Sequence, residues 1–224
     1  MDARIPAANN AAWCDLVCRA AGLRTLVHDG VWSATTRSPD AYPDAVTLRP
    51  GTGVDDVLAA VDDSAGASVK DSFADLDLTP HGYEVLFEAS WLTRAATDPA
   101  PPVLPWHVVD ATTLPRWLAA HGSASITHGV LDDPAVRLLL ASDRDGPLAV
   151  AALNRSGAAP DAVVGVSNVQ ALRADAGLVW SDLAALARRE LGPHPLVGYE
   201  AGDDLVAPVG TGFESVGRLR VWIR

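Results

Sequence analysis

The stretch Pro195 to Ile223, PLVGYEAGDDLVAPVGTGFESVGRLRVWI, decides the fold of this chain. A short apolar run leads into an acid-capped helical segment, then a turn of Gly, Phe and Glu at residues 212–214, and a second apolar run. Residues 68–92, SVKDSFADLDLTPHGYEVLFEASWL, carry a weaker copy in which residues 82–84 are Gly, Tyr and Glu and Trp91 matches Trp222. Both stretches predict a strand, a helix, a Gly-aromatic turn and a second strand.

The composition is that of a folded protein with an acidic surface. The chain has 224 residues, of which 49% are hydrophobic, and a formal net charge of −11. Acidity argues against a nucleic-acid partner, because phosphates require a basic face. It suits a cationic acceptor such as an amine, although a solvated acidic surface is the simpler explanation. No apolar run approaches the ~20 residues of a membrane span, and residues 1–10 lack the pattern of a signal peptide, so we expect a cytoplasmic protein without a membrane partner.

The N-terminal residues predict a helix that carries both cysteines. Asn9 and Asn10 precede an apolar-periodic run that Gly22 closes, which predicts a capped helix of about three turns. Cys14 and Cys18 would share one face of this helix, a poor geometry for a disulfide and half a metal site at most. We therefore expect packed cysteines and no metal.

A proline-rich stretch divides the chain. Residues 97–105 hold four prolines, and proline fixes φ and lacks the N–H that a sheet ladder needs. We expect a first half of residues 1–96, a linker of residues 97–105 and a second half of residues 106–224. The halves could share one continuous sheet or pack as tandem domains, and the sequence leaves both arrangements open.

Beyond the linker the predicted elements follow one another regularly. The patterns predict strands at 106–110, 136–142, 148–154 and 162–169, a hairpin turn at 143–146, and helices that begin near Thr113 and Trp180. Together with the tail, these elements predict an α/β fold of the α+β kind, with a mixed, mostly antiparallel sheet flanked by helices.

This order of elements resembles the GNAT superfamily of acyl-CoA-dependent N-acetyltransferases over residues 103–224, and residues 1–96 look like a shortened relative of the same fold. The resemblance implies transfer of an acyl group from acetyl-CoA or another acyl-CoA, as co-substrate, to an amine. It also implies that the pantetheine arm pairs with the fourth strand of the second half where that strand separates from the fifth. The residues there are Val166, Ser167, Asn168 and Val169. Gly165 and Gly198 would let another chain approach the backbone closely, or are ordinary strand glycines.

The loop that would bind the diphosphate departs from the pattern of that family. The family has Gln or Arg, two residues, Gly, one residue, and Gly or Ala before a helix whose first N–H groups bind the anion. Residues 173–178, RADAGL, offer Arg173 and Gly177 as the matching residues, but neither register keeps the remaining small positions. Asp175 also places a carboxylate where the diphosphate would lie. A capped structural loop is the alternative interpretation.

Two residues at the end of the fifth strand are the candidate catalytic groups. Glu200 could take the proton of the amine, and Tyr199 could protonate the leaving thiolate. The resemblance implies a Tyr about four residues before the Gly-Phe turn, but Pro208 stands there. A hydrogen-bonded phenol is the simpler role for Tyr199, and Asp203 and Asp204 are predicted to cap a helix. The competing interpretation of the whole chain is a non-catalytic GNAT-like protein that binds a ligand or a partner.

The first half holds a second polar cluster around Lys70, the only lysine of the chain. This segment, residues 70–88, would face the cleft of the second half if the halves pair, or would be a plain acidic surface helix. A cofactor loop at residues 50–54 is a further alternative, weakened by the two aspartates that follow it. His121 and His128 are predicted to be surface histidines, because they lack ligand spacing with nearby partners.

Overall fold

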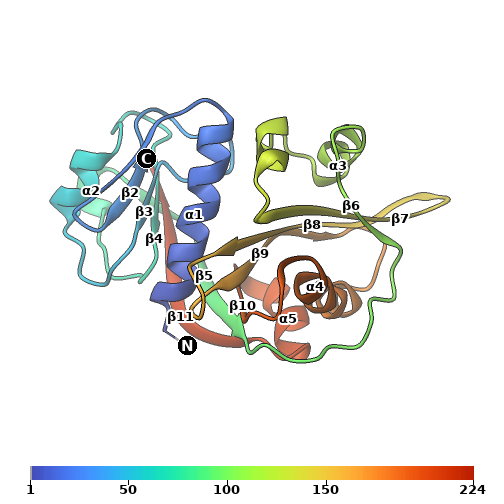
Figure 1. Cartoon of the computed structure of the whole chain (residues 1–224). Helices are drawn as coiled ribbons and strands as arrows, with labels where there is room; N and C mark the ends of the chain where they lie inside the picture. Colours follow the sequence, from blue (N-terminus) through green and yellow to red (C-terminus); the bar gives the residue numbers. More distant parts are fainter. Residues whose placement is uncertain (1) are drawn as a thin grey trace.

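One sheet runs through the whole molecule (Figure 1). The computed structural model describes residues 2–224. Its eleven strands are hydrogen-bonded in the order β1-β2-β3-β4-β11-β5-β10-β9-β8-β7-β6. Within the described residues, β3–β4 and β9–β10 are parallel pairs and the other neighbours are antiparallel. The predicted α/β fold with a mixed, mostly antiparallel sheet is confirmed.

Helices and strands lie on both sides of the linker. The first set comprises α1 (Arg4–Ala20), β1 (Thr25–His28), β2 (Val31–Ala34), β3 (Ala45–Thr47), α2 (Val54–Ala60), β4 (Ser68–Asp71), η1 (Thr79–His81) and β5 (Glu84–Arg94). The second set comprises β6 (Trp106–Val108), α3 (Leu114–His121), η2 (His128–Asp132), β7 (Val136–Asp143), β8 (Gly146–Ser156), β9 (Val163–Ala171), α4 (Ala176–Leu191), β10 (Leu196–Glu200), η3 (Gly202–Leu205), α5 (Val206–Gly210) and β11 (Glu214–Ile223).

Strands β5 and β11 are neighbours in the middle of the sheet, and together they connect its two ends. β11, the last strand of the chain, lies between β4 and β5, and β5 lies between β11 and β10. In Figure 1 both strands run through the middle of the molecule. Strands from both sides of the linker therefore contribute to one continuous sheet. The division at residues 97–105 stays a prediction.

The pairing of β5 with β11 places the two copies of the repeat about a local two-fold axis. Glu84 lies opposite Ile223, Thr93 lies opposite Glu214, and the axis passes near the pair Ala89–Leu219 at the centre of both strands. Register shifts occur at equivalent places in the two strands, at Leu86 of β5 and at Val216 of β11. Such reciprocal pairing is the geometry of an isologous contact, here within one chain.

Helices cover both faces of the second half of the sheet. On one face, Trp13 of α1 and Trp117 of α3 pack with Leu138 of β7. On the other face, Leu183 of α4 packs with Leu139, the next residue of β7. Successive strand residues point to opposite faces, so one strand supplies both cores. Figure 1 shows α3 and α4 on opposite sides of β7 and β8.

The end of the proline-rich segment is tied to α4 by one buried carboxylate. Asp182 is 2% exposed. It accepts hydrogen bonds from the backbone N–H groups of Val103 and Leu104, both at 2.8 Å, and from Nε1 of Trp106 at 3.0 Å. Three donors that would otherwise be unpaired are satisfied by this carboxylate. It fixes the start of β6 against the helix.

The predicted start of the first helix is wrong. α1 begins at Arg4, whose N–H donates to Oδ1 of Asp2 at 2.8 Å, so Asn9 and Asn10 lie in the middle of the helix and are buried. The cysteine prediction is confirmed, because Cys14 and Cys18 are free and buried on this helix. No helix within residues 2–224 is both long and apolar enough to cross a membrane.

Candidate active site

The candidate site forms where β9 and β10 separate. The two strands pair in parallel at Leu196–Val164 and Val197–Gly165, and their pairing ends there. A bulge follows in β9, where Asn168 has φ of 53° and the register with β8 shifts. No β9–β10 pair follows Val197–Gly165 within the described residues, although the carbonyl oxygen of Val166 still lies close to Gly198. The end of this ladder is the place where another extended chain could pair with β9.

A pocket of about 230 Å³ opens at this separation. We call it the central pocket. Its walls come from α1, from residues 41–43, from β4 and β5, and from the ends of α3, β9 and β10. Six of the residues predicted from the sequence line it: Val166, Ser167, Asn168, Val169, Tyr199 and Glu200. The fold thus brings together residues that the sequence separates by about thirty positions.

A second, wider hollow adjoins the central pocket on the side of α4 and α5. This outer groove has a volume of about 790 Å³ and shares Val169 and Glu200 with the central pocket. Gly177 lines it near the start of α4. The two cavities meet at Glu200, so a ligand that occupied both would pass this carboxyl group.

Glu200 lies at the junction of the two cavities. Burial raises the pKa of its carboxyl group to about 8, and the nearby charge of Asp204 adds to the shift. Within residues 2–224 no group donates a hydrogen bond to this carboxylate. An acid whose pKa lies near neutral pH and whose oxygens are free suits proton transfer to or from a ligand.

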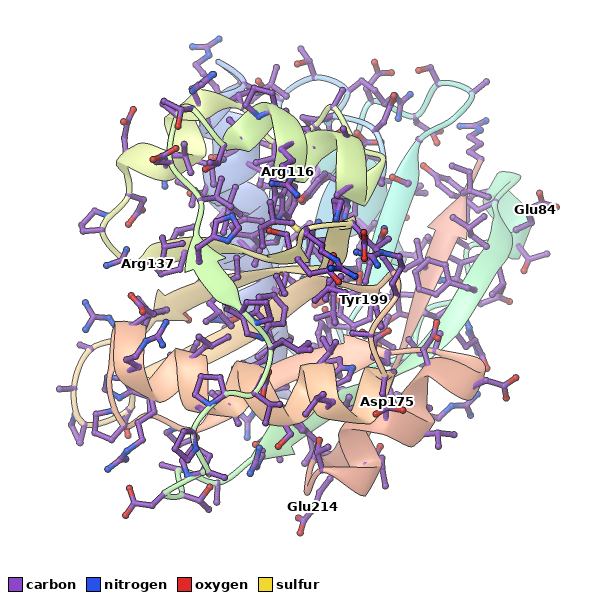
Figure 2. The ribbon with its side chains drawn as sticks, turned by 90° about the vertical axis from the view of Figure 1, so that its right-hand side faces the viewer. Glu84, Arg116, Arg137, Asp175, Tyr199 and Glu214 are labelled. Atoms are coloured by element: carbon purple, nitrogen blue, oxygen red, sulfur yellow. The ribbon has the colours of Figure 1, made fainter. Side chains whose placement is uncertain are left out.

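Tyr199 lies in the interior of the molecule, as Figure 2 shows, whereas Glu84 and Glu214 lie at its periphery. Its ring meets Trp91 edge-on, with centroids 5.5 Å apart, and Nζ of Lys70 lies 4.2 Å from its centroid. Within the described residues no hydrogen bond involves its hydroxyl, so the simpler role of a hydrogen-bonded phenol has no partner to support it. Trp91, Lys70 and Tyr199 together form one wall of the central pocket.

Helix α1 forms another wall, and its two buried asparagines hold it there. Asn9 donates to Ser156 Oγ at 2.8 Å and to the carbonyl of Asn154 at 3.2 Å, and Asn10 accepts from Nζ of Lys70 at 2.8 Å. A Cβ at Gly165 would lie 2.0 Å from Oδ1 of Asn9. The close approach at Gly165 is therefore made by the protein's own helix.

Lys70 faces the cleft of the second half, which is one of the two places that the sequence left open for its segment. It belongs to strand β4 rather than to a surface helix, and it is 3% exposed. In the pairing of β4 with β11, Lys70 lies opposite Val221. In the pairing of β10 with β5, Tyr199 lies opposite Trp91. With Glu84 aligned to Glu214, Trp91 corresponds to Val221, so Lys70 holds in the first half the place that Tyr199 holds in the second. That correspondence within the repeat was the available signal.

His121 is partly buried and packed against its neighbours, which differs from the expected surface histidine, whereas His128 is exposed. The ring of His121 stacks on Trp117 with centroids 4.8 Å apart, and its Nε2 lies 3.3 Å from Nδ2 of Asn168. Burial lowers the pKa of His121. It lies beside the bulge of β9, where its neutral ring keeps the amide of Asn168 in place.

Arg173 and Asp175 lie on either side of the loop that the resemblance assigns to the diphosphate. Arg173 donates to Asp143 at 2.6 Å and to the carbonyl of Gly146 at 2.8 Å, so its guanidinium is bound to the β7–β8 hairpin. Asp175 caps α4, because its Oδ1 accepts from the N–H of Leu178 at 2.9 Å. Figure 2 shows Asp175 at the start of this helix.

The outer groove is acidic. Asp175, Glu200, Asp203 and Asp204 line it, and none of the residues that line it is lysine or arginine. Asp203 and Asp204 lie in η3, whose first residues receive no side-chain capping hydrogen bond. The predicted capping role of these two aspartates is therefore not found at η3. Within residues 2–224 no group of three His, Cys, Asp or Glu side chains could hold a metal ion.

Comparison with solved structures identifies the class of fold. A GCN5-related N-acetyltransferase from Kribbella flavida matches 100% of this chain and 95% of its own with a TM-score of 0.69 and 18% identity. A GNAT-family acetyltransferase from Novosphingobium aromaticivorans DSM 12444 matches 97% and 98% with a TM-score of 0.63 and 14% identity. Saccharomyces cerevisiae N-myristoyltransferase with bound myristoyl-CoA matches 80% of this chain and 57% of its own, with a TM-score of 0.56 and 8% identity.

These likenesses extend over the whole chain, including the residues before the linker. No protein-family model and no curated protein matches the sequence. At these identities the likeness shows the fold alone, and the chain has a divergent GNAT fold.

Proposed function

We propose that this protein is an acyl-CoA-dependent N-acyltransferase that moves an acetyl group from acetyl-CoA to an amine. The observation that carries the proposal is the opening between β9 and β10 beside Glu200. We expect backbone groups of Val166–Val169, beyond the last β9–β10 pair, to hydrogen-bond an extended pantetheine arm, and the central pocket at its end gives an acceptor access to the thioester.

The chemistry assigns a role to each candidate residue. Glu200, once ionised, takes a proton from the ammonium form of the acceptor, either directly or through a water, and leaves a neutral amine. The amine nitrogen then attacks the carbonyl carbon, so that a C–N bond forms as the C–S bond breaks. Strand amides near Val166 polarise the carbonyl, and the hydroxyl of Tyr199 donates a proton to the departing thiolate. The nitrogen, which carries an extra proton after the C–N bond forms, gives that proton to the tyrosinate, directly or through a water, and becomes the neutral amide.

A single substitution tests the role of Glu200. Glu200→Gln keeps the shape of the side chain but cannot take a proton, so we expect turnover of acetyl-CoA with a reactive amine to fall about 100-fold at pH 7.5. Thiol release from acetyl-CoA measures the rate. The rise in melting temperature that acetyl-CoA causes should stay as in the unchanged protein, because the cofactor's contacts remain.

Glu214→Gln is the matched control, because Glu214 is exposed at the start of β11, away from both cavities. It should leave turnover within twofold. Turnover by Glu200→Gln equal to that of the control would remove Glu200 as the base.

A second candidate function is a GNAT-like protein that binds a ligand or partner without acyl transfer. The charge of the outer groove favours it, since the carboxylates of Asp175, Asp203 and Asp204 line the space where a diphosphate would lie. Each unscreened pair of like charges costs about 1 kcal/mol at 4 Å in water-like surroundings. The N–H groups at the start of α4 would have to offset that repulsion. Binding without turnover by any amine would support this second candidate.

A further inference from the structure

Lys70 presents an unpaired positive charge to the central pocket. Its Nζ has one hydrogen-bond partner in the protein, Oδ1 of Asn10 at 2.8 Å, and it lies 4.2 Å from the centre of the Tyr199 ring. Within residues 2–224 no carboxylate forms an ion pair with it. An ammonium group has three donors, so donors remain for a ligand. Buried charges in proteins are normally paired, because a buried charge without a partner is strongly destabilising.

The neighbouring groups of the pocket do not neutralise this charge. Burial raises the pKa of the Cys14 thiol to about 11, raises that of Tyr42 and lowers that of His121, so all three are neutral at pH 7. Glu200, with a pKa of about 8, is mostly protonated there. The central pocket of the free protein is therefore a positive cavity inside a protein of net charge −11.

A second free polar group lies in the same pocket. The hydroxyl of Tyr42 is buried, lines the central pocket and makes no hydrogen bond of good geometry within the described residues, although the side chains of Asn168 and Trp13 lie beside it. Unpaired buried hydroxyls are uncommon in native structures and indicate a missing partner. Tyr42 and Lys70 come from different elements, and both also line an adjoining cavity of about 340 Å³. An oxyanion between them would accept hydrogen bonds from both.

We propose that Lys70 and Tyr42 bind the carboxylate of the acceptor, so that the acceptors of this enzyme are small amino carboxylates. This inference rests on the proposed acyl transfer and names its substrate class. A pocket of 230 Å³ holds roughly eight atoms at the ~30 Å³ that each water occupies in the liquid. That is the size of a small amino acid, and the adjoining cavity leaves room for a longer side chain.

The carboxylate belongs to the acceptor rather than to the acyl group because of where Lys70 lies. The acyl-CoA would lie along the outer groove and β9, and Lys70 lines neither. It lies on β4, which β11 and β5 separate from β10. A ligand that reaches Lys70 with one end and Glu200 with the other spans the central pocket, with its amine at the junction of the two cavities.

The test is a binding measurement that needs no acyl-CoA. Melting temperature is followed with millimolar glycine, L-alanine, β-alanine and 4-aminobutyrate, each paired with its carboxamide. We expect at least one acid to raise the melting temperature, by about 5–10 °C at one hundred times its Kd, while its amide has no effect. Equal effects of acid and amide, or no effect of any acid, would overturn the proposal.

Substitutions assign the effect to the two residues. Lys70→Met keeps the length of the side chain and should weaken binding of the acid roughly 10- to 100-fold, since charge-assisted hydrogen bonds are the strong ones. The melting temperature of the free variant is measured beside the binding, because the substitution removes a buried charge without an ion-pair partner and also removes the donor of the Asn10 side chain. Tyr42→Phe, which removes only a hydroxyl, should weaken binding about tenfold.

Arg116→Met is the matched control, because Arg116 is exposed on α3 away from the pocket (Figure 2). It should bind the acid as the unchanged protein does. If Lys70→Met and Tyr42→Phe both bound the acid normally, Lys70 would be a structural residue and the proposal would be wrong.

Two further arms separate this inference from the proposed function. Succinyl-CoA with the neutral carboxamides as acceptors tests a carboxylate on the acyl group, and faster turnover there than with acetyl-CoA and the acids would overturn the assignment to the acceptor. Binding of the acid lost in Lys70→Met, without turnover by any acyl-CoA, would confirm the anion site and reject acyl transfer.

Discussion

At the scale of single residues, the site combines an acid that burial keeps protonated with a lysine that burial leaves unpaired. Glu200 and Lys70 line the same pocket, but they lie on β10 and β4, with two strands between those strands. Within the described residues Glu200 and Lys70 form no ion pair with each other. A zwitterionic amino acid matches this arrangement, with its carboxylate at Lys70 and its ammonium at Glu200, which would then ionise.

The pH dependence of turnover follows from Glu200. The base must be ionised, and its pKa in the folded protein is about 8, so turnover should rise with pH between 6 and 8 and level off above. Asp204→Asn removes one of the two causes of the raised pKa. The midpoint of the rate profile should therefore move to lower pH in this variant. A pH–rate profile of kcat/KM measures the shift, and a profile that is flat between pH 6 and 9 would contradict the role of Glu200.

The same raised pKa predicts the sign of a stability change. In the unfolded chain Glu200 loses its proton near the ordinary glutamate pKa of 4.5, whereas in the folded protein its pKa is about 8. Between these values the folded state binds more protons, so this group makes the protein less stable as pH rises. Glu200→Gln, which serves here as the control, should lose that component of the pH dependence.

At the scale of elements, buried polar side chains of α1 and α4 attach these helices to distant parts of the chain. The local sequence of neither helix indicates that role. α1 is held by Asn9 and Asn10, and α4 holds the linker through Asp182. Each of these side chains bonds to groups at least sixty positions away in the chain. They fix the walls of the central pocket and the start of β6.

Asp182→Ala should loosen the linker. The substitution leaves the N–H groups of Val103 and Leu104 and Nε1 of Trp106 without their charged partner, at a cost of about 3 kcal/mol. For a chain of this length that cost corresponds to a fall in melting temperature of about 6–12 °C. Differential scanning calorimetry measures it. Ser181→Ala, at the exposed neighbouring position, should change the melting temperature by less than 2 °C; equal melting of the two variants would refute the anchor.

At the scale of the whole molecule, β5 and β11 make the two sides of the linker depend on each other. Without β11, β4 and β5 both lose a neighbour, and without β5 the same happens to β10 and β11. Unpaired strand edges of this kind promote aggregation. The repeat thus folds as one body, with its local two-fold axis near Ala89 and Leu219.

Cutting the chain between Pro101 and Pro102 tests this dependence. We expect residues 1–101 and residues 102–224 to be insoluble when made separately and to form a one-to-one complex when made together. Size-exclusion chromatography and circular dichroism distinguish these states. Two fragments that each melt sharply on their own would show that the halves are independent domains.

The sequence predicted elements well where the signal is local. The hairpin at residues 143–146 and the strands on either side of it are found as predicted, because turn residues and alternating apolar residues lie within a few positions of one another. The place of β11 between β4 and β5, the burial of Lys70 and the inward position of Asn9 depend on contacts between distant segments. Polar residues in the middle of a helix resemble caps when only local spacing is known. The predicted candidates Tyr199 and Glu200 do meet β9 at one pocket, and their roles stay predictions.

The central claim, that this GNAT fold binds and uses an acyl-CoA, is tested most directly by melting the protein with millimolar acetyl-CoA, with free CoA and with ATP. Our account predicts a rise of about 5–10 °C with acetyl-CoA and with CoA at one hundred times Kd, and none with ATP. No rise with acetyl-CoA or CoA, or an equal rise with ATP, would contradict it.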